Sequence, residues 1–286
     1  MPRVILITND SMHGQRVLHN VWQRGIVLDA VLYLTGSLAM PAPRGVGLGG
    51  RLARWPRTAA SAVKRTVLFH RKRKASYAKL CARVIGTGGM NSRRLLRDLR
   101  ALAPDWIILG GGGILGPEVI ETARVGVLNA HPALLPWIRG VGITGASLEH
   151  GVALGASLHY VDRGIDTGAL IERRLIRVTP ADTSLGDLEL ACHTLAAEIM
   201  TDAVEAIVRR GEVPAGVRQT LRYPLFRAPG GETMQHHQAL AAAGRAHALY
   251  EAWRPLCDDA ERGTLPAATF DPPQTLTLKP VATPPR

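Results

Sequence analysis

The amino-acid sequence predicts an α/β fold built on an open, twisted, mostly parallel sheet with helices on both faces. Short β-branched runs alternate with segments of helical periodicity near the start of the chain, and the alternation returns from about residue 91 to residue 209. Strands joined through helices in this way lie parallel and are connected by right-handed crossovers. With 46% hydrophobic residues among 286, the chain can bury the core that such a fold requires.

The first strand–helix–strand unit begins close to the N-terminus. Residues 3–8 are a β-branched run followed by Asn-Asp-Ser, which indicates a buried strand and then a helix cap. Residues 13–24 have apolar side chains at helical spacing, and Gly25 is typical of the residue that ends a helix. Residues 26–34 are mostly apolar and predict the second strand.

A basic segment then interrupts the alternation. Residues 36–56 are rich in Gly, Pro and Arg and predict an irregular excursion, whereas residues 58–84 have apolar positions at helical spacing among basic ones and predict a basic amphipathic helix. Residues 44–74 contain ten Arg or Lys and no acidic residue, which accounts for most of the net charge of +12. We interpret residues 36–84 as a basic insertion after the second strand.

The rest of the sheet is predicted from the alternation that follows. Its elements are a helix near 91–101, a strand at 105–109, a short helix at Pro117, a strand at 125–129, a helix near 142–150, strands near 154–162 and 168–178, and a long helix at 184–209. Beyond this point the periodicity degrades, and the last 23 residues contain six prolines, which is typical of an extended or disordered tail. We therefore expect a core domain over 1–209 and a small C-terminal extension over 210–286.

Composition excludes several classes of protein. The cysteines Cys81, Cys192 and Cys257 lie far apart, so neither a disulfide framework nor a zinc site is favoured. The apolar run at the N-terminus is too short for a signal peptide. No window approaches the roughly 18 continuous apolar residues that a membrane span needs. These features predict a cytoplasmic protein without a metal.

The most informative stretch is Val127–Pro136, which reads VLNAHPALLP. Residues two apart in a strand project to the same side, so Asn129 and His131 point together at the carboxyl end of the strand, where open α/β sheets hold their ligands. Pro132 ends the ladder pairing there. An amide donor beside an imidazole can stabilise an oxyanion. Taken alone, the same pair also fits a turn asparagine and a partly buried rim histidine.

A second stretch, residues 156–171, runs from an alternating strand into a loop that holds Asp162 and Asp166 among glycines. Either carboxylate can cap the amides of its own loop, which is the common role of Asp before Gly. A carboxylate beside His131 can instead keep the imidazole protonated and relay a proton. His159, on the strand that enters the loop, fits a packed histidine and a supporting residue equally well.

Together these stretches resemble the folate-dependent formyltransferases, which include glycinamide ribonucleotide, methionyl-tRNA and amino-sugar formyltransferases. The motif LNAHPALLP with a following RG, and the later SLHYVDRGIDTGALI, place Asp166 at a family-like separation of 37 residues from Asn129. The resemblance covers about residues 100–205 and includes Gly113–Glu118, which is similar to the pterin-side segment of the family. It implies the Rossmann-like formyltransferase fold, with residues 1–209 as the catalytic domain.

The resemblance also implies the site. Asn129 and His131 would contact the formyl oxygen, while Asp166 would orient and protonate His131 and shuttle the proton of the amine. The co-substrate would be 10-formyltetrahydrofolate, with no metal. The residues implied to bind its pterin are Gly113, Ile114, Leu115, Arg163 and Gly164.

Departures from the family pattern narrow the range of acceptors that we expect. Residues 8–14 lack the phosphate-binding Gly-Asn-Gly-Ser loop of glycinamide ribonucleotide formyltransferases and contain Asp10, whose charge would repel phosphate. The tRNA enzymes add a C-terminal β-barrel, for which residues 210–286 are too few and too rich in proline. Formyltetrahydrofolate hydrolases carry a domain before the sheet. We expect transfer to the primary amine of a small molecule, namely an amino sugar, amino acid or peptide.

Two alternatives stay open at this point. One is a formyltetrahydrofolate hydrolase, and the other is a non-catalytic polyanion-binding protein on the same fold. The basic residues 44–84 would suit an anionic or nucleotide-linked substrate, and a solvated basic helix is a more common meaning of such a run than nucleic-acid binding. The sequence does not specify an oligomeric state.

Overall fold

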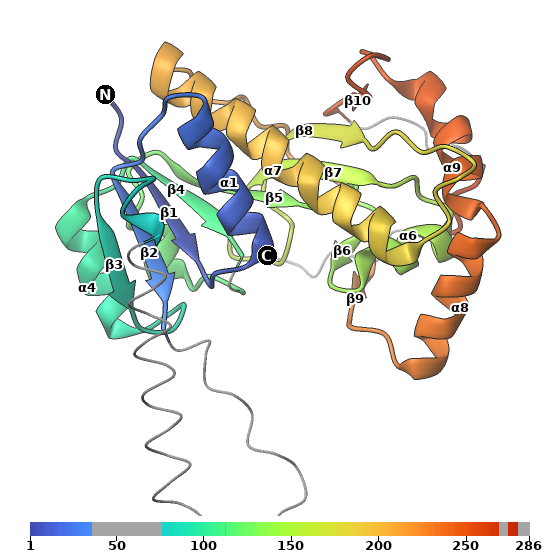
Figure 1. The fold of residues 1–286 in the computed structure, drawn as a ribbon, viewed down its shortest axis with the longest axis horizontal. Coiled ribbons are helices and arrows are strands. Elements are labelled where there is room, and N and C mark those ends of the chain that lie inside the picture. The colour runs from blue at the N-terminus through green and yellow to red at the C-terminus, as the bar shows by residue number, and fades with distance from the viewer. Residues whose placement is uncertain (36–75, 112, 269–273, 280–286) are drawn as a thin grey trace, which may run out of the picture.

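The computed structural model describes residues 1–35, 76–111, 113–268 and 274–279 (Figure 1). Within them an eight-stranded sheet has the strand order β10-β8-β7-β5-β4-β1-β2-β3. The neighbouring strands β5, β4, β1, β2 and β3 pair in parallel. The pairs β5–β7, β7–β8 and β8–β10 are antiparallel. The predicted mostly parallel sheet is confirmed.

The N-terminal unit has the predicted order. It consists of β1 (Val4–Thr8), α1 (Met12–Gln23) and β2 (Ala30–Leu34), whose strands are buried along their whole length. Ser11 caps α1 by accepting a hydrogen bond from the Gly14 amide at 3.2 Å, and its hydroxyl donates to the Gly110 carbonyl at 2.6 Å. A Cβ at Gly14 would lie 2.6 Å from that carbonyl, so the first turn of α1 sits directly on the end of β4.

The predicted basic insertion is wrong at its C-terminal end. Val84, which we placed in a helix, begins β3 (Val84–Thr87), and this strand pairs in parallel with β2. Before it, Tyr77 and Cys81 are buried in the core at 3% and 7% exposure. Tyr77 and Cys81 therefore belong to the core, and Val84 belongs to the sheet. The rest of the predicted excursion and helix, residues 36–75, lies outside the described part of the chain.

The middle of the chain follows the prediction closely. Its elements are α4 (Arg93–Leu102), β4 (Trp106–Gly110), α5 (Pro117–Ile120), β5 (Gly126–His131), β6 (Arg139–Gly140), α6 (Ile143–His150), β7 (Gly155–Tyr160), β8 (Leu170–Leu175) and α7 (Leu185–Arg210). Pro117 occupies the first turn of α5, where its missing amide proton costs nothing.

The C-terminal extension contains structure that the sequence did not reveal. It forms β9 (Leu225–Phe226), α8 (Gly231–Ala242), α9 (Arg245–Trp253), a short 3₁₀ turn (Arg254–Leu256) and β10 (Thr264–Leu265). β10 joins the main sheet beside β8, and Trp253 packs edge-on against Trp137 with ring centroids 5.1 Å apart. The extension thus shares a core with the preceding domain rather than hanging from it.

Helices cover both faces of the sheet, as predicted (Figure 1). α1 and α7 pack on one face in a cluster that includes Val17 and Met200, and α4 packs on the other through Leu95 and Leu99. A third cluster joins α6, α8 and α9 at the end of the sheet that holds β8. No helix in the described ranges is long and apolar enough to cross a membrane.

Candidate active site

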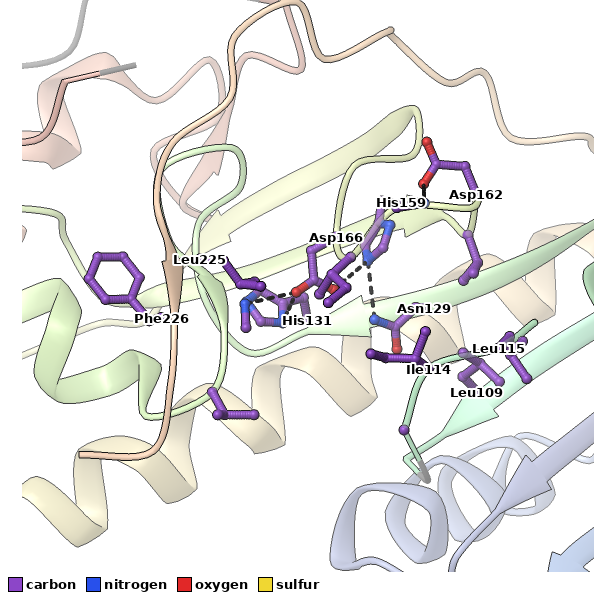
Figure 2. A pocket seen from close by; sticks show the side chains of 16 residues that line it. Leu109, Ile114, Leu115, Asn129, His131, His159, Asp162, Asp166, Leu225 and Phe226 are labelled. Atoms are coloured by element: carbon purple, nitrogen blue, oxygen red, sulfur yellow. Dashed lines mark hydrogen bonds and ion pairs between the residues drawn. The ribbon is translucent and has the colours of Figure 1, made fainter. Parts of the chain in front are cut away.

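The predicted catalytic residues meet at the carboxyl end of β5, beside a cavity of about 350 Å³ (Figure 2). Asn129 and His131 line it from β5, and Asp166 lines it from the loop between β7 and β8. Apolar side chains complete much of the wall. These are Leu109, Ile114, Leu115, Val141, Val161, Ile165, Leu225 and Phe226.

Four of the five predicted pterin-binding residues line this cavity. Gly113, Ile114, Leu115 and Gly164 are among its wall residues. Arg163 is the exception, because its exposed guanidinium turns outward and donates a hydrogen bond to Glu121 Oε1 at 3.2 Å. The prediction for Arg163 concerned the backbone of its loop, whose residues Gly164, Ile165 and Asp166 line the cavity, and it stays a prediction.

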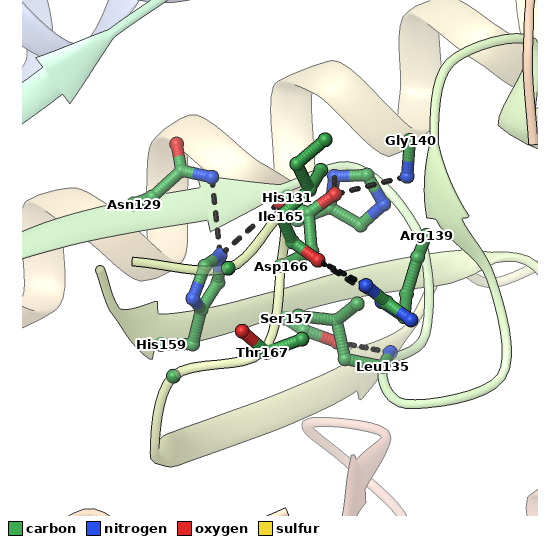
Figure 3. Close-up of polar contacts among 12 residues, drawn as sticks. Asn129, His131, Leu135, Arg139, Gly140, Ser157, His159, Ile165, Asp166 and Thr167 are labelled. Carbon is green, nitrogen blue, oxygen red and sulfur yellow. Dashed lines mark hydrogen bonds and ion pairs between the residues drawn. The ribbon is translucent and has the colours of Figure 1, made fainter. Parts of the chain in front are cut away.

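His131 is 5% exposed and held in one orientation (Figure 3). Its Nε2 lies 3.0 Å from the Ile138 carbonyl oxygen, so the proton of the neutral ring belongs on Nε2, which donates it. Its other nitrogen, Nδ1, faces Asp166 Oδ2 at 3.8 Å. Nδ1 of His131 is therefore the ring nitrogen that lies beside a carboxylate.

Asp166 is fixed by contacts from two directions. The Gly140 amide donates to its Oδ2 at 2.9 Å. The guanidinium of Arg139 donates to the adjacent Ile165 carbonyl at 2.7 and 3.0 Å, and also to the Tyr223 carbonyl at 3.0 Å. Burial lowers the pKa of Arg139, while the nearby Asp166 opposes that shift. Asp166 has a left-handed φ of 54°, an unfavourable conformation for a non-glycine residue that these bonds maintain.

His159 connects Asn129 to the same carboxylate. It is the cross-strand neighbour of Asn129 on β7 and is 2% exposed. Its Nδ1 lies 2.7 Å from the Tyr160 carbonyl oxygen, and its Nε2 lies 3.1 Å from Asn129 Nδ2 and 3.7 Å from Asp166 Oδ1. Burial lowers the pKa of His159, which favours the neutral ring.

The neutral tautomer of His159 determines how the amide of Asn129 is turned. With its proton on Nδ1 and donated to Tyr160, Nε2 can only accept, so Asn129 Nδ2 must donate to it. One N–H of the amide is thereby occupied, and the other is available to a ligand in the cavity. Of the two roles considered for His159 from the sequence, the contacts favour the supporting one.

Asp162 has the loop-capping role that the sequence left open for both acids of the loop. Its Oδ1 accepts hydrogen bonds from the Gly164 amide at 3.0 Å and the Thr167 hydroxyl at 2.6 Å. It therefore caps the loop, while Asp166 faces the histidines. A Cβ at Gly168 would lie 1.8 Å from the Tyr160 carbonyl oxygen, so the return of this loop requires glycine.

A second cavity of about 470 Å³ adjoins the first. Asn129 and His131 line both cavities, together with Leu109, Gly113 and Gly140. The second cavity adds Ser11, Met12 and His13 from the start of α1, and His193 from α7. Asn129 and His131 therefore border two cavities, whereas Asp166 lines only the first.

Sequence reasoning missed His13 and His193. Burial is the main cause that lowers the pKa of His13 to about 4, and the charges of His193 and Arg16 lower it further. Burial also lowers the pKa of His193. Neither ring nitrogen of His13 has a hydrogen-bond partner among the described residues. The backbone of His193 lies close enough to oppose part of the lowering of the His13 pKa. The position of His13 in the first turn after β1 was its only signal in the sequence.

Among the residues that the structure describes, no three His, Cys, Asp or Glu side chains are grouped so as to hold a metal ion. His237, beside which the sequence has a second histidine, instead contacts Glu149 Oε2 through Nε2 at 2.9 Å and joins α8 to α6.

Comparison with known proteins shows which family the chain resembles. The model of the formyl transferase family matches residues 59–204, which include both motifs. The chain belongs to the formyl transferase family. Methionyl-tRNA formyltransferases from Burkholderia orbicola and Burkholderia vietnamiensis are each 34% identical to it over 158 residues, covering 54% of this chain and 47% of theirs. The chain thus spans about half the length of the curated relatives that it matches.

Solved structures of the family share the fold. Glycinamide ribonucleotide transformylase 1 from Symbiobacterium toebii superposes with a TM-score of 0.52 at 20% identity, over 76% of this chain and 92% of that one. A sugar N-formyltransferase from a Shewanella species superposes with a TM-score of 0.52 at 12% identity, over 85% and 88%. The predicted membership of the family and the predicted Rossmann-like formyltransferase fold are confirmed.

Proposed function

We propose that the protein transfers the formyl group of 10-formyltetrahydrofolate to the primary amine of a small molecule, such as an amino sugar, amino acid or peptide. The observation that supports this most directly is that Asn129 and His131 border two cavities, with Asp166 beside them in the wall of the first. One cavity can receive the formyl donor and the other the amine, with the reacting atoms meeting at the end of β5.

The first cavity suits a folate better than the second does. Its apolar walls, among them Ile114, Leu115 and Phe226, fit the faces of a flat pterin, and the backbone of the loop at Gly164 fits its polar edge. When bound, 10-formyltetrahydrofolate would supply an activated formyl group. The second cavity, lined by His13 and His193, is then left for the amine.

The side chains can stabilise the charge that develops during transfer. As the amine nitrogen bonds to the formyl carbon, negative charge grows on the formyl oxygen. The donors available to it are the free N–H of Asn129 and a proton carried on Nδ1 of His131, which lies 3.8 Å from Asp166 and is not hydrogen-bonded to it. The bond between the formyl carbon and the folate nitrogen then breaks.

Asp166 can accept and return the protons that move in the same reaction. The attacking nitrogen must lose a proton, and the departing folate nitrogen must gain one. The carboxylate of Asp166, beside His131 Nδ1 at 3.8 Å, can accept the first proton and, once protonated, return it to the departing nitrogen directly or through His131. A fixed carboxylate that faces two histidines is suited to this relay, whereas Asp162 is committed to its loop.

The proposal is tested by incubating the full chain with 10-formyltetrahydrofolate and a panel of amino sugars, amino acids and peptides. We expect tetrahydrofolate and an N-formylated product in equal amounts, with an amine required. Release of formate in the absence of any amine would instead support the hydrolase alternative. 5-Formyltetrahydrofolate at about a hundred times its Kd should stabilise the fold by about 3 kcal/mol. No melting shift together with no turnover would contradict the proposal.

A further inference from the structure

The chain that follows α7 runs back over the loop that holds Asp166. At the end of this loop, Leu170 and Val217 exchange two backbone hydrogen bonds, at 2.7 and 2.8 Å. A Cβ at Gly216 would lie 2.8 Å from that of Ala169, so the two stretches of chain are in close contact. The crossing therefore lies in the C-terminal extension, beyond the residues that we expected to form the catalytic domain.

Just after this crossing point, the side-chain amide of Gln219 donates to two carbonyls of the loop. Its Nε2 lies 2.6 Å from the Gly168 carbonyl oxygen and 3.3 Å from the Asp166 carbonyl oxygen. The side chain is half-buried. Because carbonyl oxygens only accept hydrogen bonds, the NH₂ group of the amide must face them. A side chain that cannot donate would leave both carbonyls without this partner.

The carbonyls on the two sides of the Asp166 Cα are thus held by different side chains. The preceding carbonyl, of Ile165, accepts from the Arg139 guanidinium at 2.7 and 3.0 Å (Figure 3). The following carbonyl, of Asp166 itself, accepts from Gln219. Because each peptide unit is planar, the first contact orients the peptide before the Cα and the second orients the peptide after it. Together they fix the backbone from which the carboxylate projects.

These contacts are needed because the backbone of Asp166 is in an unfavourable conformation. Its φ of 54° lies in the left-handed region, which non-glycine residues seldom adopt. Such a conformation persists only where the surrounding structure imposes it. In this conformation the carboxylate accepts from the Gly140 amide at 2.9 Å and lies 3.8 Å from His131 Nδ1. Loss of a backbone contact would let the residue relax and would move the carboxylate away from both partners.

The same stretch of chain, residues 216–226, contacts the site at two further points. The Tyr223 carbonyl accepts a hydrogen bond from the Arg139 guanidinium at 3.0 Å. Leu225 and Phe226 of β9 line the first cavity (Figure 2). Residues 216–226 therefore support the loop directly and through the guanidinium, and they also supply part of the cavity wall.

We propose that Gln219 is a positioning residue for Asp166, and that it keeps the carboxylate beside His131 by holding the backbone of the loop. The proposal rests on the proposed function for the reaction that the carboxylate serves, whereas the positioning is a property of the folded chain. Gln219 is not one of the described residues that line the two cavities, so it acts through the loop. Residues 216–226 are then part of the catalytic unit.

The first experiment follows amide hydrogen exchange in the full chain and needs no turnover. The Gly140 amide reports where the carboxylate lies, because Asp166 Oδ2 is its acceptor. Gln219→Met keeps the length of the side chain and removes its donors, so the Gly140 amide should exchange about tenfold faster. The matched control, Gln238→Met at an exposed position of α8, should leave this exchange unchanged, and the amides of β1 should exchange alike in all three proteins. Equal exchange of the Gly140 amide in the wild type and Gln219→Met would overturn the proposal.

The second experiment measures formyl transfer with and without the Asp166 carboxylate. In the otherwise wild-type chain, Gln219→Met should lower kcat about 10- to 100-fold, as expected for a slightly misplaced catalytic group, and change the KM for 10-formyltetrahydrofolate less than about threefold. In Asp166→Asn the same substitution should lower kcat no further, because the group that Gln219 positions is already lost. Equal losses in both backgrounds, or a raised KM with unchanged kcat, would overturn the proposal. If the wild type transfers no formyl group while Gly140 exchange still depends on Gln219, the positioning stands and the proposed function fails.

Discussion

Replacing His13 by glutamine, which has a similar length and does not titrate, should make the stability of the protein less sensitive to acid. The pKa of His13 is lowered to about 4 from the ordinary 6.5, mainly by burial and further by the charges of His193 on α7 and Arg16 on α1. Each pKa unit corresponds to about 1.4 kcal/mol, so the whole shift corresponds to about 3 kcal/mol of unfolding free energy.

The sign of the effect follows from which state binds the proton. The pKa of His13 is lower in the folded chain, so the unfolded chain takes up this proton first as the pH falls below about 6.5. The contribution of His13 to stability is therefore complete above pH 6.5 and is lost as the pH falls towards 4. His193, whose pKa burial also lowers, acts in the same direction in the wild type and in the variant.

Urea denaturation at about pH 7 and about pH 4.5 measures this directly. The unfolding free energy of the wild type should fall by about 2–3 kcal/mol more than that of His13→Gln over this interval. Val17→Ala, a substitution of a fully buried residue on the same helix, is the control because its cost should not change with pH. Parallel pH profiles for the wild type and His13→Gln would refute the burial argument.

The catalytic geometry gives three further predictions. Asp166→Asn keeps the size of the side chain and removes its charge, so formyl transfer should slow by about 10²–10⁴ with folate affinity largely kept; Asp162→Asn should cost far less, and the reverse order would contradict the proton relay. Asn129→Ala should slow transfer by about 10²–10³ through loss of an oxyanion donor, measured in the same tetrahydrofolate assay. Arg139→Leu leaves the carbonyls of Ile165 and Tyr223 without their donor, so chemical denaturation should show a loss of about 2–4 kcal/mol of unfolding free energy. An unchanged denaturation midpoint would contradict the role of Arg139 in holding these carbonyls.

Local patterns were sufficient for the elements that border the site. β5 and its loop were predicted because two-residue periodicity and Pro132 act within a few residues of each other. β3 was missed because Val84 continues the helical spacing of the basic segment, and only its pairing with β2 makes it a strand. α8 was missed because its buried face is just His237 and Ala241, which is too narrow for an apolar stripe.

What the sequence could not predict about the site has a similar physical origin. Asn129, His131 and Asp166 were identified through motifs that lie within one stretch of the chain. Arg139 holds the Asp166 loop through carbonyls that are 26 and 84 residues away, and no pattern in the sequence indicates contacts of that range. His13 reaches the site because α1 is packed closely on β4, which is likewise a tertiary contact.

The two cavities that Asn129 and His131 border draw on different parts of the chain. The first is built mainly from residues 109–166, with the short strand β9, whereas what distinguishes the second is the start of α1 and one histidine of α7. Under the proposed function, mutations in the first turns of α1 would alter which amine is accepted without disturbing the residues proposed to handle the formyl group. Acceptor specificity would then be able to diverge while the proposed chemistry at β5 remains under separate selection.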